Sequence, residues 1–151
     1  MNGTEPTSTA GRLELCTFRL GGALCGVDIL TVQEINRHLS LTPVPQAPSY
    51  VRGVTNLRGR VITVVDLGAK LGLGAHQPGE QSRNLIVNSR GELIGLLVDR
   101  IEDVVPADQT AVEPPPSNVG GKLGSCFSGV VKRELGLIHI LDLERALGDG
   151  E

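Results

Sequence analysis

Short apolar runs separated by glycine-containing turns recur along most of the chain, and this spacing limits the folds open to it. Many of the runs are rich in Val and Ile, which favour strands. Regular short strands between tight turns are typical of barrels and sandwiches, and they argue against alternating β-α units. The predicted strands cover residues 13–20, 24–29, 51–57, 61–65, 83–88, 93–100, 127–132 and 137–141.

The connections between these strands carry their own signals. Gly21-Gly22 predicts a two-residue hairpin, and further tight turns are expected at Arg58-Gly59, Arg90-Gly91 and Leu135-Gly136. Short helices are predicted over 29–36, 66–73 with Asp66 as N-cap, and 142–147. The proline-rich stretches 42–48 and 106–116 are predicted to be extended connectors.

The length of 151 residues suits one domain with a core of its own. We expect a disordered N-terminal tail over residues 1–11, which offer nothing to bury, then one domain over 12–148 and a short C-terminal tail over 149–151. The expected fold class is therefore all-β with short helices.

Charge and composition exclude several functions. The net charge of −3 provides no positive field for nucleic acid or anionic lipid, and aromatics at 2% provide no base-stacking surface. The chain shows neither a signal peptide nor a long apolar run, so direct membrane insertion is not expected and the predicted location is cytoplasmic.

No enzyme signature accompanies the cysteines and histidines. Cys16, Cys25 and Cys126 form no C-x-x-C pair and have no histidine at metal-ligand spacing, so reduced thiols are expected. The Gly72-x-Gly74 stretch follows a predicted helix instead of a strand, which argues against a dinucleotide site. We predict no catalysis, no metal and no cofactor.

The most distinctive segment runs from Gly53 to Leu67 and is predicted to form strand, turn, strand and helix start. Arg58 falls at the strand end, facing outward, and Gly59 permits the tight reversal. The run from Val61 to Val65 is interrupted only by Thr63, which suggests a strand covered on both faces. These residues alone are also compatible with a hairpin in any β domain.

Several ordered blocks resemble the CheW family. They are Phe18-Arg19-Leu20, Gly26-Val27-Asp28-Ile29, Val32-Gln33-Glu34-Ile35, Val51 through Gly59, Val65-Asp66-Leu67 and Gly95 through Asp99. The resemblance covers residues 12–148, and its most specific part is Arg52-Gly53-Val54-Thr55-Asn56-Leu57-Arg58-Gly59. It implies two intertwined five-stranded SH3-like β-barrels.

The chain departs from the family pattern at two positions. Thr63 stands where the family usually has proline, and Cys25 stands where it usually has an aromatic residue. Threonine is compatible with a strand, so we expect the strand to persist. Cysteine is smaller than a ring, so the first barrel must repack or lose about 1–3 kcal/mol.

The resemblance also implies a function: a non-enzymatic adaptor that couples the cytoplasmic signalling tip of chemoreceptors to the regulatory domain of a CheA-type histidine kinase, recruited to membrane-associated receptor arrays. Receptor-binding candidates are Val32, Glu34, Asn56 and Arg58. Weaker kinase-binding candidates are Arg83, Asn84 and Leu85.

The sequence leaves other interpretations of these residues open. Helical spacing over 29–36 would place Val32 and Ile35 on one side and expose Glu34, yet Val32 could equally be a core residue. Glu34 and Arg58 could be solvated charges, and 83–85 could be an interior strand. Alternative functions are an adaptor of a non-flagellar chemosensory pathway or an unrelated SH3-like peptide-binding module, although the scarcity of aromatics disfavours the latter.

Overall fold

A computed structural model describes residues 12–37, 39–73, 79–115, 124–134 and 136–147. The two predicted tails and Leu135 of one predicted turn lie outside these ranges. The strands are β1 (Arg12–Leu20), β2 (Ala23–Asp28), β3 (Val32–Asn36), β4 (Val51–Leu57), β5 (Arg60–Asp66), β6 (Arg83–Ser89), β7 (Glu92–Val98), β8 (Arg100–Asp108), β9 (Phe127–Arg133) and β10 (Gly136–Leu141). The helical elements are η1 (Ile29–Thr31), α2 (Leu67–Lys70), η2 (Gln109–Ala111) and α4 (Leu143–Leu147).

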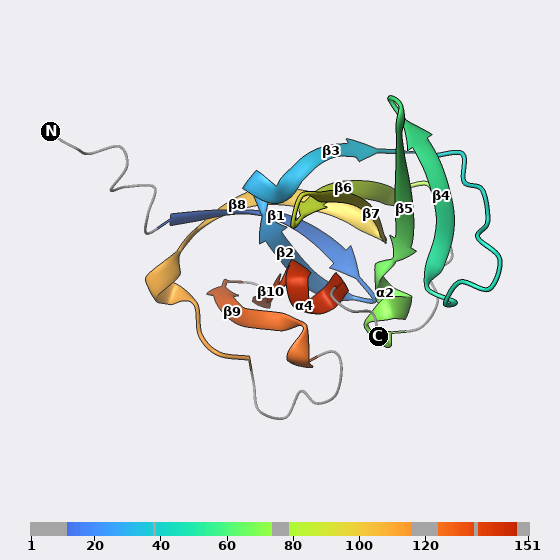
Figure 1. The fold of residues 1–151 in the computed structure, drawn as a ribbon. Coiled ribbons are helices and arrows are strands. Elements are labelled where there is room, and N and C mark those ends of the chain that lie inside the picture. Colours follow the sequence, from blue (N-terminus) through green and yellow to red (C-terminus); the bar gives the residue numbers. More distant parts are fainter. Residues whose placement is uncertain (1–11, 38, 74–78, 116–123, 135, 148–151) are drawn as a thin grey trace, which may run out of the picture.

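The strands form two five-stranded sheets with the orders β8-β1-β2-β10-β9 and β3-β6-β7-β5-β4. We call the first sheet the first barrel and the second sheet the second barrel (Figure 1). The chain begins in the first barrel, builds the second with β3 to β7, and returns to the first at β8. The prediction of two intertwined five-stranded barrels is therefore confirmed.

The two barrels are built on the same plan. In each, a hairpin (β1–β2 or β6–β7) pairs on one side with a single strand taken from the other half of the chain, β8 or β3. The register is the same as well. Cys16 and Leu85 stand at the same position of the two hairpins, and Val104 lies opposite Cys16 just as Ile35 lies opposite Leu85. Adding 69 to the numbers of β3 thus gives the equivalent positions of β8.

The hairpins β4–β5 and β9–β10 correspond in the same way. Leu57 pairs with Arg60, and 76 residues later Arg133 pairs with Gly136. The helices that follow begin alike, because the Asp66 carboxylate accepts from the amide of Ala69 and the Asp142 carboxylate accepts from that of Arg145, at 3.1 and 3.2 Å. Asp66 is the N-cap predicted from sequence, although α2 ends at Lys70, earlier than expected.

The largest apolar cluster lies between the barrels and draws on both. Phe18 of β1, Leu85 of β6 and Leu67 of α2 are fully buried in it, and Leu143 of α4 belongs to it with 9% exposure. Cys25 also belongs to this cluster, so the position where the family usually has a ring faces the other barrel. Thr63 lies within β5, and the strand persists there as expected.

The prediction of a helix over 29–36 is wrong. The Asp28 carboxylate accepts a hydrogen bond from the Leu30 amide at 3.0 Å and caps a single 3₁₀ turn, after which the backbone becomes extended at Val32. Residues Val32–Asn36 then form β3 and pair with β6. Pairing with a strand distant in sequence overrides the weak helical spacing.

Two other expectations need correction. Residues 106–108, expected in a connector, belong to β8, where Pro106 is tolerated because β8 is an edge strand. The strand 61–65 is not covered throughout, since Val61 at the start of β5 is 74% exposed. The remaining residues of that run are buried or half-buried.

Each barrel has an extended segment laid against its outer hairpin. Thr42 exchanges two backbone hydrogen bonds with Val54 of β4, and Glu113 exchanges two with Val130 of β9, all at 2.8–2.9 Å. Glycines allow this approach: a Cβ at Gly53 would lie 2.7 Å from the Thr42 carbonyl oxygen, and one at Gly129 would lie 2.7 Å from that of Glu113. These segments cover edges that could otherwise pair with another chain.

We predict that Gly129→Ala destabilises the fold by about 1–3 kcal/mol, because the new methyl would also lie 2.6 Å from Cγ1 of Val112. Urea denaturation followed by circular dichroism measures the change. Gly79→Ala is the matched control, since a Cβ there meets no atom within 4 Å. Equal stability of the two variants would contradict the close-approach explanation.

Candidate functional site

The distinctive turn predicted from sequence has a defined geometry. Arg58 and Gly59 have φ values of 52° and 86°, and Leu57 pairs with Arg60 on either side of them. Two successive left-handed residues in a two-residue hairpin form the turn that matches the twist of the flanking strands. The Asn56 side-chain oxygen accepts from the Gly59 amide at 2.8 Å, so Asn56 holds the turn in shape.

This turn places Arg58 beside Glu34, and the two side chains form an ion pair. Glu34 comes from β3 and Arg58 follows β4, which are the two outermost strands of the second barrel's sheet. The ion pair therefore joins the two edges. Arg58 is 71% exposed and Glu34 only 22%, so the carboxylate anchors a guanidinium that remains open to solvent.

The strand geometry of β3 reverses the exposure expected from helical spacing. Ile35 is 43% exposed, whereas Glu34 and Val32 are half-buried. Glu34 also accepts a hydrogen bond from the Asn36 amide group at 3.3 Å. Ile35 follows Glu34 directly in β3 and is exposed on the opposite face of the strand, a position that helical spacing did not predict.

The three kinase-binding candidates lie at the start of β6 and differ in accessibility. Leu85 is fully buried in the cluster between the barrels and Asn84 is 6% exposed. Arg83 is half-buried, and its guanidinium donates to the carbonyl oxygens of Glu80 and Ser82 at 2.9 and 2.8 Å. Of the three, Arg83 offers side-chain surface to a partner.

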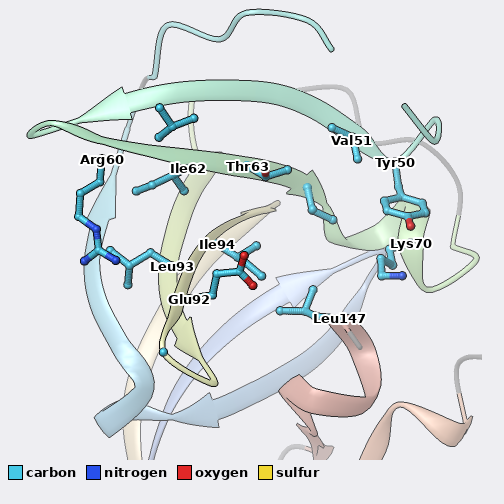
Figure 2. A pocket seen from close by; sticks show the side chains of 13 residues that line it. Tyr50, Val51, Arg60, Ile62, Thr63, Lys70, Glu92, Leu93, Ile94 and Leu147 are labelled. Carbon is cyan, nitrogen blue, oxygen red and sulfur yellow. The ribbon is translucent and has the colours of Figure 1, made fainter. Parts of the chain in front are cut away.

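A groove of about 310 Å³ lies on the other side of β5, between that strand and β7 (Figure 2). The two strands pair in parallel only from Thr63 and Ile94 onward, so they diverge towards the β6–β7 turn. At the far end the Lys70 ammonium lies 4.3 Å from the centre of the Tyr50 ring, although Lys70 is only 8% exposed. The ring face stabilises this cation.

The folded chain brings one cysteine and one histidine into register. Cys25 of β2 pairs with His139 of β10, an adjacency not visible in the sequence. Burial raises the pKa of the Cys25 thiol to about 12, and burial lowers the pKa of His139, whose ring lies 5.5 Å from that of Phe127. A thiol that stays protonated near neutral pH is a poor nucleophile.

Among the described residues, no group of His, Cys, Asp and Glu side chains could hold a metal ion. The helices in the described ranges are all too short to cross a lipid bilayer.

The comparisons with known proteins agree with one another. The family model described as the CheW-like domain matches residues 14–151. The chain is 35% identical over 136 residues to the chemotaxis protein CheW of Rhizobium meliloti, covering 90% of this chain and 88% of that protein. It is 31% identical over 144 residues to the chemotaxis protein CheW of Treponema pallidum, covering 93% and 85%.

A solved structure is similar as well. The crystal structure of the scaffolding protein TtCheW from Thermoanaerobacter tengcongensis matches with a TM-score of 0.83 and 33% identity, covering 92% of this chain and 95% of that one.

We predict that Cys25 resists iodoacetamide in the folded protein at pH 8 and reacts rapidly in urea, as measured by mass spectrometry of tryptic peptides. The ordinary thiol pKa is 9.0 and the folded value is about 12, so folding favours the neutral thiol. That contribution to stability is complete below pH 9 and declines as the pH rises towards 12. Rapid labelling of folded Cys25 would contradict this environment.

Proposed function

The chain belongs to the CheW-like family, and on that premise we propose that it couples the cytoplasmic signalling tip of chemoreceptors to the regulatory domain of a CheA-type histidine kinase. The family and the similar scaffolding protein indicate a non-catalytic adaptor in chemotaxis. The proposed coupling would take place in the cytoplasm, where the adaptor is recruited to receptor arrays at the membrane.

The observation that supports the receptor contact is the exposed guanidinium of Arg58. Glu34 pairs with it on one side and the turn fixes its backbone, which lowers the conformational freedom lost on binding. An arginine keeps several N–H donors when one carboxylate is bound, and these can meet acceptors on a receptor helix. The half-buried Val32, on the same strand as Glu34, would supply apolar contact near it.

Asn56 contributes to the proposed contact indirectly. Its side chain closes the turn through the Gly59 amide, so its loss would displace Arg58 without removing a partner contact. We therefore assign Glu34 and Asn56 as positioning residues and Arg58 as the contact.

For the kinase we propose a contact at the barrel end near Arg83. Its two hydrogen bonds to backbone carbonyls fix the guanidinium at the entrance to β6. The buried Asn84 and Leu85 would support the strand from within instead of touching the kinase.

Arg58→Ala is expected to reduce receptor-dependent kinase activation and co-sedimentation of the ternary complex by about tenfold, with an unchanged melting temperature, because an exposed ion pair contributes less than about 1 kcal/mol to folding. Arg90→Ala is the matched control. Arg90 also occupies a left-handed turn position, at φ 55°, before Gly91, whose amide is held by Asn88 at 2.9 Å. Equal loss in both variants, or parallel loss of folding, would remove Arg58 from the contact.

Arg83→Ala is expected to weaken binding of the isolated kinase regulatory domain severalfold and to leave binding of the receptor fragment unchanged. Isothermal titration calorimetry with each partner separately measures both affinities. An unchanged affinity for the kinase domain would show that the contact lies elsewhere on the surface.

A further inference from the structure

The first barrel has a groove at the place where the second barrel has the groove of Figure 2. Its volume is about 600 Å³, and it lies where β2 and β10 diverge, because their parallel pairing begins only at Cys25 and His139. The equivalent pairing in the second barrel begins at Thr63 and Ile94. The two grooves therefore follow from the same strand arrangement.

Exposed aliphatic side chains stand at equivalent positions of the two barrels. Val104 of β8 is 51% exposed and corresponds to Ile35 of β3, and Leu137 of β10 is 38% exposed and corresponds to Val61 of β5. Leu137 lines the groove of the first barrel. Each barrel end thus carries two aliphatic residues that the fold leaves in water.

The charges at the two barrel ends differ. The position of Glu34 is taken in the first barrel by Asp103, and the position of Arg58 is taken by Glu134. Both acids are exposed and line the groove. In the second barrel an ion pair at these two positions joins the edge strands. In the first barrel both positions carry a carboxylate.

The arginines nearby do not pair with these two carboxylates. Arg19 and Arg100 both contact Glu102, at 3.2 and 2.7 Å. Arg133 lies on the groove wall and pairs with neither acid among the described residues. Asp103 and Glu134 form no ion pair with any described residue.

The whole first barrel is acidic. Residues 12–28 and 99–147 contain seven Lys and Arg against ten Asp and Glu, a net charge of −3, whereas residues 29–98 contain seven against four, a net charge of +3. A field of this sign attracts cationic segments to the first barrel and orients them on approach.

We propose that the groove of the first barrel docks an extended segment of a separate protein that presents an arginine beside β-branched side chains. The guanidinium lies between Asp103 and Glu134 and joins the edge strands β8 and β9 from outside, as Arg58 joins β3 and β4 from within. The aliphatic side chains cover Leu137 and the half-buried Leu24 on the groove wall.

The test is an NMR titration of the full chain, ¹⁵N-labelled, with the blocked peptide acetyl-Gly-Val-Arg-Val-Gly-amide. The control peptide carries citrulline, which keeps the shape of arginine and removes its charge. We expect saturable shifts at the amides of Asp103, Val104, Glu134 and Leu137 at millimolar peptide, with the citrulline peptide binding about fivefold more weakly.

Two variants of equal charge separate the site from the general field. Asp103→Asn with Glu134→Gln is expected to weaken binding about fivefold, whereas Glu14→Gln with Glu144→Gln, on exposed first-barrel positions outside the groove, leaves it within twofold. Equal weakening by both pairs, equal binding of the citrulline peptide, or the absence of saturable shifts overturns the proposal. Concentration-dependent broadening of the same amides without peptide would assign the groove to a second copy of this chain and also overturn it.

Discussion

Neither barrel can be completed by one half of the chain, because each takes its hairpin from one half and three strands from the other. The apolar faces of β1 and β6 consequently meet in a single cluster, with Phe18 and Leu85 fully buried inside it. The two barrels therefore share one apolar interior. That shared interior holds the surface turns rigidly, which is what an adaptor without chemistry requires.

The local features of this fold were open to prediction from sequence. Gly21-Gly22, Arg58-Gly59 and Arg90-Gly91 all adopt left-handed turns, and the Asp66 cap stands where expected. The failures concern β3 and part of β8, whose identity is set by partners 48 or more residues away in the chain. Spacing reports which side of an element is apolar, but it carries no information on which strand will pair with it.

In the candidate site, too, the local features were predictable and the long-range contacts were not. The outward position of Arg58 follows from the turn, whereas its pairing with Glu34 depends on β3 and β4 meeting at the edges of one barrel. The receptor role proposed for these residues rests on family resemblance, since an exposed ion pair alone is compatible with a solvated surface. Ile35 was missed because a helix would have turned it inward, while β3 turns it outward.

The exchange of strands between the halves also affects synthesis on the ribosome. β2 ends at Asp28, but its neighbour β10 ends only at Leu141, so roughly 6–23 s of elongation separate them at about 5–20 residues per second. The second barrel gains its last strand at Val98 and can form first. During that interval the nascent β1–β2 hairpin carries Phe18 and Leu20 without its neighbour β10, and the second barrel is the apolar surface already available to it.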